Sequence, residues 1–253
     1  MRAPSGNRFH PDWFAVPILV GLHACSGPDA TSPRITAGDL VGNLRAQDPT
    51  VEVAQVFQSE IPGLYGVELA GGNFVYGTAD GRHLVAGDLY ALGGGLENLT
   101  EGRREAWRRR LLAEVDPGVA IPYPAREPRW AITVFTDVDC VHCQRLHSEV
   151  HELNKASVSV RYMAYPRAGL ESSSYSDMVS AWCAADRRTA LTRLKRGKPI
   201  PVQVCNNAVA EQYDLAKQLG LTGTPGIVTE SGKLIIGFES VELLLAAVQI
   251  REG

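Results

Sequence analysis

Two cysteines separated by two residues form the pair best suited to chemistry in this sequence. Cys140 and Cys143 stand in the run Cys140-Val141-His142-Cys143. A cysteine at the N-terminus of a helix meets unpaired backbone N–H groups and a partial positive charge, which favour its thiolate. A second cysteine one helical turn further on can attack a mixed disulfide formed at the first. The pair therefore predicts dithiol–disulfide exchange.

His142, between the two cysteines, is a third group that bears on this chemistry. A protonated imidazole or an N–H donor near the sulfur of Cys140 would favour the thiolate and stabilise the reduced pair. The sequence therefore predicts a relatively oxidising couple.

Other sites share this cysteine spacing, and the sequence argues against each of them. Half of many zinc sites has the same spacing, but Cys183 and Cys205 supply no second Cys-x-x-Cys pair. Heme attachment requires a histidine directly after the second cysteine, where Gln144 stands. His147 and His151 lie four positions apart, but no third ligand is apparent, so we interpret them as surface or packing residues. We expect no metal and no cofactor.

The N-terminal residues indicate export. Basic residues near the start precede an apolar run from Trp13 to Leu22, which is typical of an export signal and too short to span a membrane. The run Leu22-His23-Ala24-Cys25 is similar to the lipobox of bacterial lipoproteins, in which the signal is cut before a cysteine that is then acylated. Lipidation of Cys25 is our expectation, and an ordinary signal cleaved nearby is the alternative.

The cysteine count fits an exported protein. Five cysteines are an odd number, and lipidation of Cys25 would leave two pairs. We interpret Cys183 and Cys205 as a structural disulfide in an oxidising compartment, closing a polar loop. Such a closure contributes about 3 kcal/mol by restricting the unfolded chain.

Two regions of different pattern flank a helical segment. Residues 51–92 alternate β-prone runs with turn signals, which indicates a small sheet. Further on, a β-branched and aromatic run leads into the cysteine pair, and apolar residues at helical spacing follow the pair. The expected helices are Ala37–Ala46, Glu97–Val115 and Gln144–Leu153, and the expected strands are Val51–Phe57, Leu64–Leu69, Asn73–Tyr76, Arg82–Ala86 and Trp130–Phe135.

The helix expected between the two regions carries a basic run. Trp107, Leu111 and Val115 recur at four-residue spacing and mark its apolar side. A basic run could bind an acidic partner, but we interpret it as a solvated face. The arginines concerned are Arg103, Arg104, Arg108, Arg109 and Arg110.

Thr224 and Pro225 stand between two glycines, just before a hairpin expected over residues 227–236. A proline in such a turn is either trans or cis. If it is cis, the flanking backbone could pair with an extended substrate near Cys140.

The bulk composition excludes some partners. The chain has 253 residues, 45% of them hydrophobic, and a formal net charge of −3. It can bury a real core, and length alone suggests one or two domains. The charge provides no overall attraction to nucleic acid or to an anionic membrane surface.

The sequence resembles the periplasmic disulfide isomerases of the DsbC/DsbG family from about Ile35 to its C-terminus. The order and spacing of its motifs match those of the family. The most specific pieces are Ile132-Thr133-Val134-Phe135-Thr136-Asp137 running into the cysteine pair, Ala181-Trp182-Cys183-Ala184, and Leu219-Gly220-Leu221-Thr222-Gly223-Thr224-Pro225.

The resemblance implies an α+β fold with a small cystatin-like α+β dimerisation domain, a helical linker and a thioredoxin-like α/β catalytic domain. It implies that Cys140 attacks, that Cys143 resolves, that Thr224-Pro225 is a substrate-binding cis-proline loop, and that Cys183 bonds Cys205. The expected divisions are a signal peptide over 1–24, a tether over 25–34, the dimerisation domain over 35–95, the linker over 96–118 and the catalytic domain over 119–253.

The resemblance also implies partners and a location. It implies a V-shaped homodimer with contacts made by the sheet around Phe74 to Leu84, and an apolar cleft for misfolded, disulfide-containing exported proteins. A membrane thiol reductant of the DsbD type would keep the cysteine pair reduced. The expected location is the periplasm, with a lipid anchor on Cys25.

Two positions depart from related patterns. The family's isomerases often carry Gly-Tyr between the cysteines, whereas this chain has Val141-His142. A histidine at the second of these positions is similar to the strongly oxidising DsbA type. Many thioredoxin relatives place a buried carboxylate where Val134 stands here, as in the DsbC-like pattern. Proton transfer to Cys143 must then use another group or water. A dithiol oxidase and a client-binding chaperone are the alternatives to an isomerase.

Overall fold

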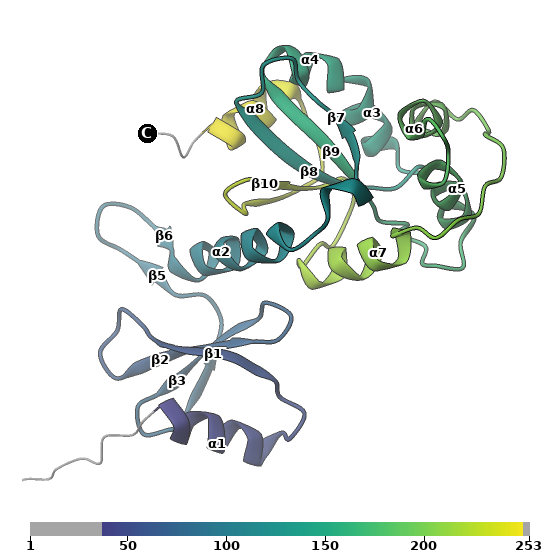
Figure 1. Cartoon of the computed structure of the whole chain (residues 1–253). Helices are drawn as coiled ribbons and strands as arrows, with labels where there is room; N and C mark the ends of the chain where they lie inside the picture. The colour runs from purple at the N-terminus through teal and green to yellow at the C-terminus, as the bar shows by residue number, and fades with distance from the viewer. Residues whose placement is uncertain (1–36, 250–253) are drawn as a thin grey trace, which may run out of the picture. The chain divides into compact units, whose positions relative to one another are not determined.

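The computed structural model describes residues 37–249 (Figure 1). The expected signal peptide, the tether and the lipidation site at Cys25 lie outside the described residues. Within residues 37–249, no helix is long and apolar enough to cross a membrane.

The first described region is a helix on an antiparallel sheet whose strands follow one another in the order β1-β2-β3-β4. Leu40 of the helix packs on Gly77, where a side chain would collide with it. Val67, Phe74 and Tyr76 are buried and form the core of the sheet. The elements are α1 (Ala37–Gln47), β1 (Val53–Gln58), β2 (Leu64–Leu69), β3 (Phe74–Thr78) and β4 (Leu84–Ala86), which confirms the elements expected here.

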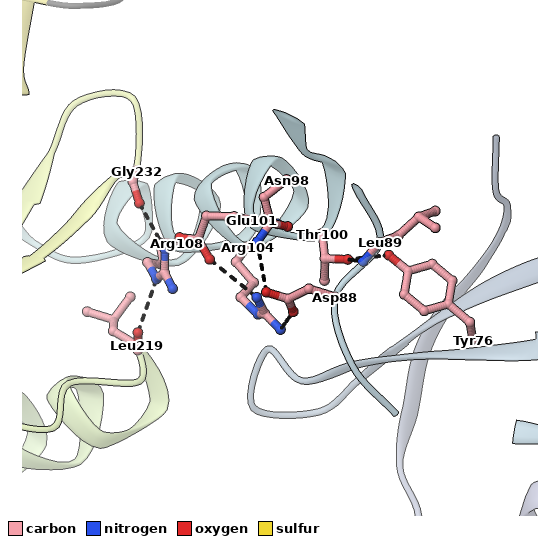
Figure 2. Close-up of polar contacts among 10 residues, drawn as sticks. All are labelled: Tyr76, Asp88, Leu89, Asn98, Thr100, Glu101, Arg104, Arg108, Leu219 and Gly232. Atoms are coloured by element: carbon pink, nitrogen blue, oxygen red, sulfur yellow. Dashed lines mark hydrogen bonds and ion pairs between the residues drawn. The ribbon is translucent and has the colours of Figure 1, made fainter. Parts of the chain in front are cut away.

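A short hairpin of β5 (Tyr90–Ala91) and β6 (Glu97–Asn98) leads directly into α2 (Leu99–Ala113). Asn98 caps this helix by accepting the backbone N–H of Glu101 at 2.8 Å. The hydroxyl of Thr100 accepts the Leu89 backbone N–H at 2.8 Å and bonds the Tyr76 hydroxyl at 2.6 Å. The helix start is thereby fixed to the antiparallel sheet (Figure 2).

The basic side of α2 is only partly the solvated face that we expected, because Arg109 and Arg110 are exposed but the other three arginines are not. Arg108 is buried and donates to the carbonyl oxygens of Leu219 at 3.2 Å and Gly232 at 3.4 Å (Figure 2). Arg110 forms an ion pair with the buried Glu68 at 2.7 Å. Arg103 and Arg104 also have partners, the ring of Phe57 and the carboxylate of Asp88. The physical reason is that the helix packs on both sides, so its long cations satisfy carbonyls and carboxylates.

The last region is built on a sheet of five strands in the order β11-β10-β8-β9-β7, of which only β8 and β9 pair in parallel. Its strands are β7 (Ile121–Tyr123), β8 (Trp130–Thr136), β9 (Val158–Ala164), β10 (Gly226–Thr229) and β11 (Leu234–Ile236). A 3-10 turn, η1 (Pro117–Val119), precedes β7, and the helices are α3 (Val141–Ser148), α4 (Val150–Lys155), α5 (Ser173–Trp182), α6 (Arg187–Lys195), α7 (Val209–Gln218) and α8 (Val241–Gln249).

Strand β8 is buried on both faces, as its apolar run predicts. Ile132 and Val134 join a core cluster with Leu146 of α3, whereas Phe135 joins a second cluster with Leu219 after α7. Alternate residues of a strand point to opposite faces, so the two clusters lie on opposite sides of the sheet. The strand is thereby held firmly at the point where the cysteine pair follows.

Candidate active site

Cys140 is the N-cap of α3, four residues after β8 ends. Its sulfur accepts the backbone N–H of Cys143 at 3.3 Å. Both cysteines are free thiols, and their exposed fractions are 2% for Cys140 and 1% for Cys143. The sulfur of Cys140 therefore meets the N-terminus of a helix, the position that the sequence predicts for a thiolate.

The loop before β10 faces this cysteine. Because β10 pairs with β8, with Gly226 opposite Phe135, the residues before Gly226 lie beside the start of α3. The Thr224-Pro225 peptide bond is cis. In the thiol form, Cys140 donates its S–H to the Thr224 carbonyl oxygen, which lies 3.3 Å from Sγ. The fold thus brings together the cysteine pair and the Thr224-Pro225 loop.

The pKa values of the two thiols move in opposite directions. A hydrogen bond from Cys143 is the largest cause that lowers the pKa of Cys140 to about 5, with help from the side chain of Thr224 and from the guanidinium of Arg167. Burial raises the pKa of Cys143 well above its usual value. At neutral pH one sulfur is a nucleophile and the other stays protonated.

His142 lies on the exposed side of the site. Its side chain lines a cavity of about 390 Å³ together with Ile236 and Leu243. The groups that lower the pKa of Cys140 do not include His142, and among the described residues no hydrogen bond joins His142 to the Cys140 sulfur. The proposed effect of His142 on the thiolate stays a prediction.

A buried lysine that sequence reasoning missed lies behind the cysteines. Lys195, the last residue of α6, donates to the Thr136 hydroxyl at 2.6 Å and to the Asp137 carbonyl oxygen at 2.7 Å. The carboxylate of Asp137 accepts from Arg167 at 3.2 Å. We had interpreted the residues around Lys195 as a polar loop, because nothing in a run of basic residues distinguishes the buried cation from its exposed neighbours.

The second pair of cysteines is joined by a disulfide, whereas the first pair consists of free thiols. Cys183 and Cys205 form a disulfide with an S–S distance of 2.05 Å and a Cα–Cα distance of 5.6 Å. It joins the end of α5 to the segment before α7. Part of the segment between these cysteines, which we expected to be a loop, is helix α6.

His147 is a packing residue. Its ring nitrogens bond the hydroxyls of Tyr162 at 3.2 Å and Thr192 at 3.0 Å. Burial lowers its pKa to about 4, so the ring is neutral at neutral pH. Among residues 37–249, no cluster of three or more histidines, cysteines or carboxylates could hold a metal ion.

These features define a class of protein. A thiolate at a helix N-terminus, a buried second thiol one turn later and a facing cis-proline loop make a dithiol centre for thiol–disulfide exchange on a mixed sheet.

Similarity of this sequence to known domains and proteins identifies its family. A thioredoxin-like domain matches residues 122–249, and the N-terminal domain of disulfide bond isomerase proteins matches residues 27–101. The thiol:disulfide interchange protein DsbC of Dickeya dadantii is 34% identical over 85% of this chain and 92% of that protein. DsbC of Salmonella typhimurium is 35% identical over 75% of this chain and 78% of that protein.

A solved disulfide interchange protein from Neisseria gonorrhoeae is 28% identical, covers 55% of this chain and 99% of its own, and has a TM-score of 0.49.

The chain belongs to the DsbC family of thiol:disulfide interchange proteins. It is therefore an enzyme of the disulfide isomerase and oxidoreductase class, with the α+β fold that the sequence predicts.

Proposed function

We propose that Cys140 attacks wrongly formed disulfides of exported proteins and that Cys143 resolves the resulting mixed disulfides. The observation that carries this assignment is the position of Cys140 at the N-cap of α3, where its sulfur accepts the Cys143 N–H and its pKa falls to about 5. A thiolate at neutral pH is the attacking species in exchange.

The exchange with a client disulfide begins with a mixed disulfide and ends in one of two ways. The thiolate of Cys140 forms a bond to one client sulfur, and the other client sulfur leaves with the electron pair and takes a proton from solvent. If that freed thiolate attacks another disulfide of the client, it displaces a different client thiolate. When this second thiolate attacks the client sulfur of the mixed disulfide, the client is rearranged and Cys140 leaves with the electron pair as a thiolate. Otherwise Cys143 loses its proton and attacks the Cys140 sulfur, which releases the client reduced and leaves the enzyme with a Cys140–Cys143 disulfide.

The Thr224-Pro225 loop is the proposed binding site for the extended client backbone. Pro225 has no N–H, and the Thr224 carbonyl oxygen lies beside the attacking sulfur. The adjacent cavity of about 390 Å³ offers apolar contacts from Ile236 and Leu243. Val141, beside Cys140, is 73% exposed and extends this apolar surface.

The protein is proposed to act as a homodimer through residues 35–95, with residues 96–118 as the linker and 119–253 as the catalytic domain. The match to the isomerase N-terminal domain supports a dimer. Strand β4 is a sheet edge whose Leu84 and Val85 are 49% and 52% exposed, as expected of strands that pair with a second copy.

The location and the reductant are also part of the proposal. We propose that residues 1–24 are an export signal that directs the chain to the periplasm, that Cys25 carries a lipid anchor, and that Cys183–Cys205 is a structural disulfide. A membrane reductant of the DsbD type would return the Cys140–Cys143 disulfide to the dithiol form.

Recovery of nuclease activity from scrambled ribonuclease in a glutathione buffer tests the function. The protein should restore activity, and Cys140→Ser should abolish the recovery. Rapid oxidation of reduced ribonuclease without recovery of the scrambled form would instead support a dithiol oxidase, which the low pKa of Cys140 also favours. Full prevention of client aggregation by a Cys140→Ser, Cys143→Ser double variant would support a chaperone.

A further inference from the structure

The resolving step lacks an obvious base. Cys143 must lose its proton before it attacks the Cys140 sulfur, yet burial raises its pKa well above the usual value. The strand position that holds a carboxylate in many thioredoxin relatives is Val134, which is fully buried and apolar. Another group must take the proton if the step is to run near neutral pH.

Lys195 lies where such a group is needed. Its exposed fraction is 4%, and the two oxygens that its ammonium contacts, Thr136 Oγ1 at 2.6 Å and Asp137 O at 2.7 Å, are neutral. The Thr136 hydroxyl and the Asp137 backbone N–H also act on Cys143, whose pKa both of them lower. The Thr136 hydroxyl therefore contacts the Lys195 nitrogen directly and also acts on the Cys143 thiol, so it can relay a proton between them.

We propose that Lys195 is a positioning residue for the resolving step, which takes the proton of Cys143 through the Thr136 hydroxyl and stabilises the resulting thiolate with its charge. The inference rests on the proposed roles of Cys140 and Cys143. The neutral amine of Lys195 accepts a proton from Thr136 as Thr136 accepts the proton of Cys143. The Cys143 thiolate then bonds the Cys140 sulfur, and the client sulfur leaves with the electron pair.

Burial lowers the pKa of Lys195 to about 8, so an appreciable fraction of the amine is neutral near physiological pH. The negative charge of Cys140 is one of the groups that raise this pKa. A mixed disulfide removes that charge, so Lys195 loses its proton more readily at the step that needs a base. The thiol and the amine then titrate as a pair, which reaches the thiolate–ammonium state by losing one proton.

The other titratable groups near Lys195 and Cys143 do not act as the base for Cys143. Burial lowers the pKa of His147 to about 4, so it does not titrate between pH 6 and about 9. The Asp137 carboxylate is held by Arg167 at 3.2 Å. The charged and titratable groups that interact with Lys195 or Cys143 are Cys140, Asp137, Asp139, Arg167, His147 and Tyr162.

A proton on Lys195 also has a route to solvent. Lys195 lines a cavity of about 480 Å³ together with His147, Thr192 and Arg196. Arg196, next in the chain to the buried lysine, is exposed. Water in such a polar cavity can exchange protons with the amine between turnovers.

The test follows the two steps separately in the full-length chain with Cys25→Ser, which serves as wild type because a third thiol would also react with the reagent. Reduced protein is mixed with dithiobis(nitrobenzoate), an aromatic disulfide that releases one coloured thiolate when Cys140 attacks and a second when Cys143 resolves the mixed disulfide. The second leaving group needs no proton, so the second phase reports only the ionisation of Cys143. Its rate is measured against pH in wild type, Lys195→Met, Thr136→Val and the exposed-lysine control Lys198→Met.

We expect the second phase of wild type to rise with pH and level off below about 8, the pKa that Lys195 has beside a charged Cys140, because the mixed disulfide removes that charge. In Lys195→Met and Thr136→Val it should slow at least about tenfold at neutral pH, with its midpoint moved upward. The first phase should persist in every variant, and Lys198→Met should match wild type in both phases. A merely structural role of Lys195 would change the thermal stability without moving this midpoint.

An unchanged second phase in both Lys195→Met and Thr136→Val would overturn the proposal. A slow Lys195→Met with an unchanged Thr136→Val would overturn the relay through Thr136. If Lys195→Met does not fold, Thr136→Val decides alone. Loss of the first phase in wild type would instead contradict the proposed role of Cys140, so the two failures are distinguishable.

Discussion

Cys140 and Cys143 belong to one helical turn, yet their environments displace their pKa values in opposite directions. Cys140 is the N-cap and receives a backbone N–H and a thiol proton, both of which stabilise an anion. Cys143 lies inside the helix, where burial penalises its anion. Two cysteines three residues apart therefore differ in their proposed roles. Cys140 attacks, and Cys143 reacts only after a mixed disulfide has formed.

The reduced protein should show this difference in an alkylation titration. The rate of iodoacetamide reaction at Cys140 should reach half its maximum near pH 5, and Cys143 should stay unreactive there. The folded-state pKa of Cys140 is depressed, so its contribution to the stability of the reduced form is fully present above its unfolded value of about 8.5. That contribution is lost as pH falls through about 5. Peptide mapping of the alkylated sites reports both rates, and a Cys140 midpoint near 8.5 would contradict the assignment.

The same titration decides the part played by His142. If its imidazole favours the Cys140 thiolate, His142→Tyr should raise the alkylation midpoint and make the couple more reducing. An unchanged midpoint and potential would leave Cys143, Thr224 and Arg167 as the groups that depress the pKa.

Among the helices and strands, periodicity and turn residues predicted β1 to β4, β8 and the β10–β11 hairpin, but they did not predict β5, β6, β7 or β9. β2 spans Leu64–Leu69 as expected, and β8 extends the predicted run by one residue to Thr136. The helix expected over Gln144–Leu153 is divided instead into α3 and α4, which meet at Glu149. Apolar spacing continues through that break, so the sequence shows one helix where the structure has two.

The site could be predicted only where its residues are close in sequence or carry a motif. The cysteine pair is such a motif, and Thr224-Pro225 could be named from its glycines and the following strand. Lys195 and Arg167 could not, because their roles depend on α6 packing against the end of β8 and on the segment after β9 reaching Asp137. Contacts between distant segments leave no local pattern in a single sequence.

The contact between α2 and the β10–β11 turn should be sensitive to one glycine. Gly232 has a φ of +89°, and a side chain there would collide with the backbone oxygen of Glu105 in α2. Gly169 has the same φ but no atom in the way, so it is a matched control. Gly169→Ala should cost about 1–2 kcal/mol of unfolding free energy, which is the price of the backbone conformation alone.

Gly232→Ala should cost clearly more than this control, because the helix or the turn must also shift. Thermal and urea unfolding of both variants measure the difference. Equal losses of unfolding free energy in the two variants would show that α2 and the turn can move apart without destabilising the protein.

At the scale of the whole molecule, dimerisation matters because two catalytic domains can act on one bound client. A client held by one subunit meets the second thiol at a high effective concentration. The proposed dimer therefore links the exposed edge of the first sheet to the efficiency of the cysteine pair.

A charge on the sheet edge tests this link. Val85→Glu should convert the dimer to a monomer, because a carboxylate would be desolvated in the strand pairing that we propose for β4. The monomer should lose most of its activity on scrambled ribonuclease while Cys140 keeps its reactivity toward small disulfides. Light scattering after size exclusion measures the mass, and Val202→Glu, on a side chain that is 85% exposed elsewhere, is the matched control. A dimer that persists in Val85→Glu would exclude β4 from the interface.

If Cys140 forms the covalent bond to the client, that bond can be trapped. A Cys143→Ser variant cannot resolve the mixed disulfide, so incubation with scrambled ribonuclease should accumulate an adduct that a reductant dissolves. Mass spectrometry of its peptides should find ribonuclease bound to Cys140. Absence of an adduct, or an adduct that also forms in Cys140→Ser, would contradict the account.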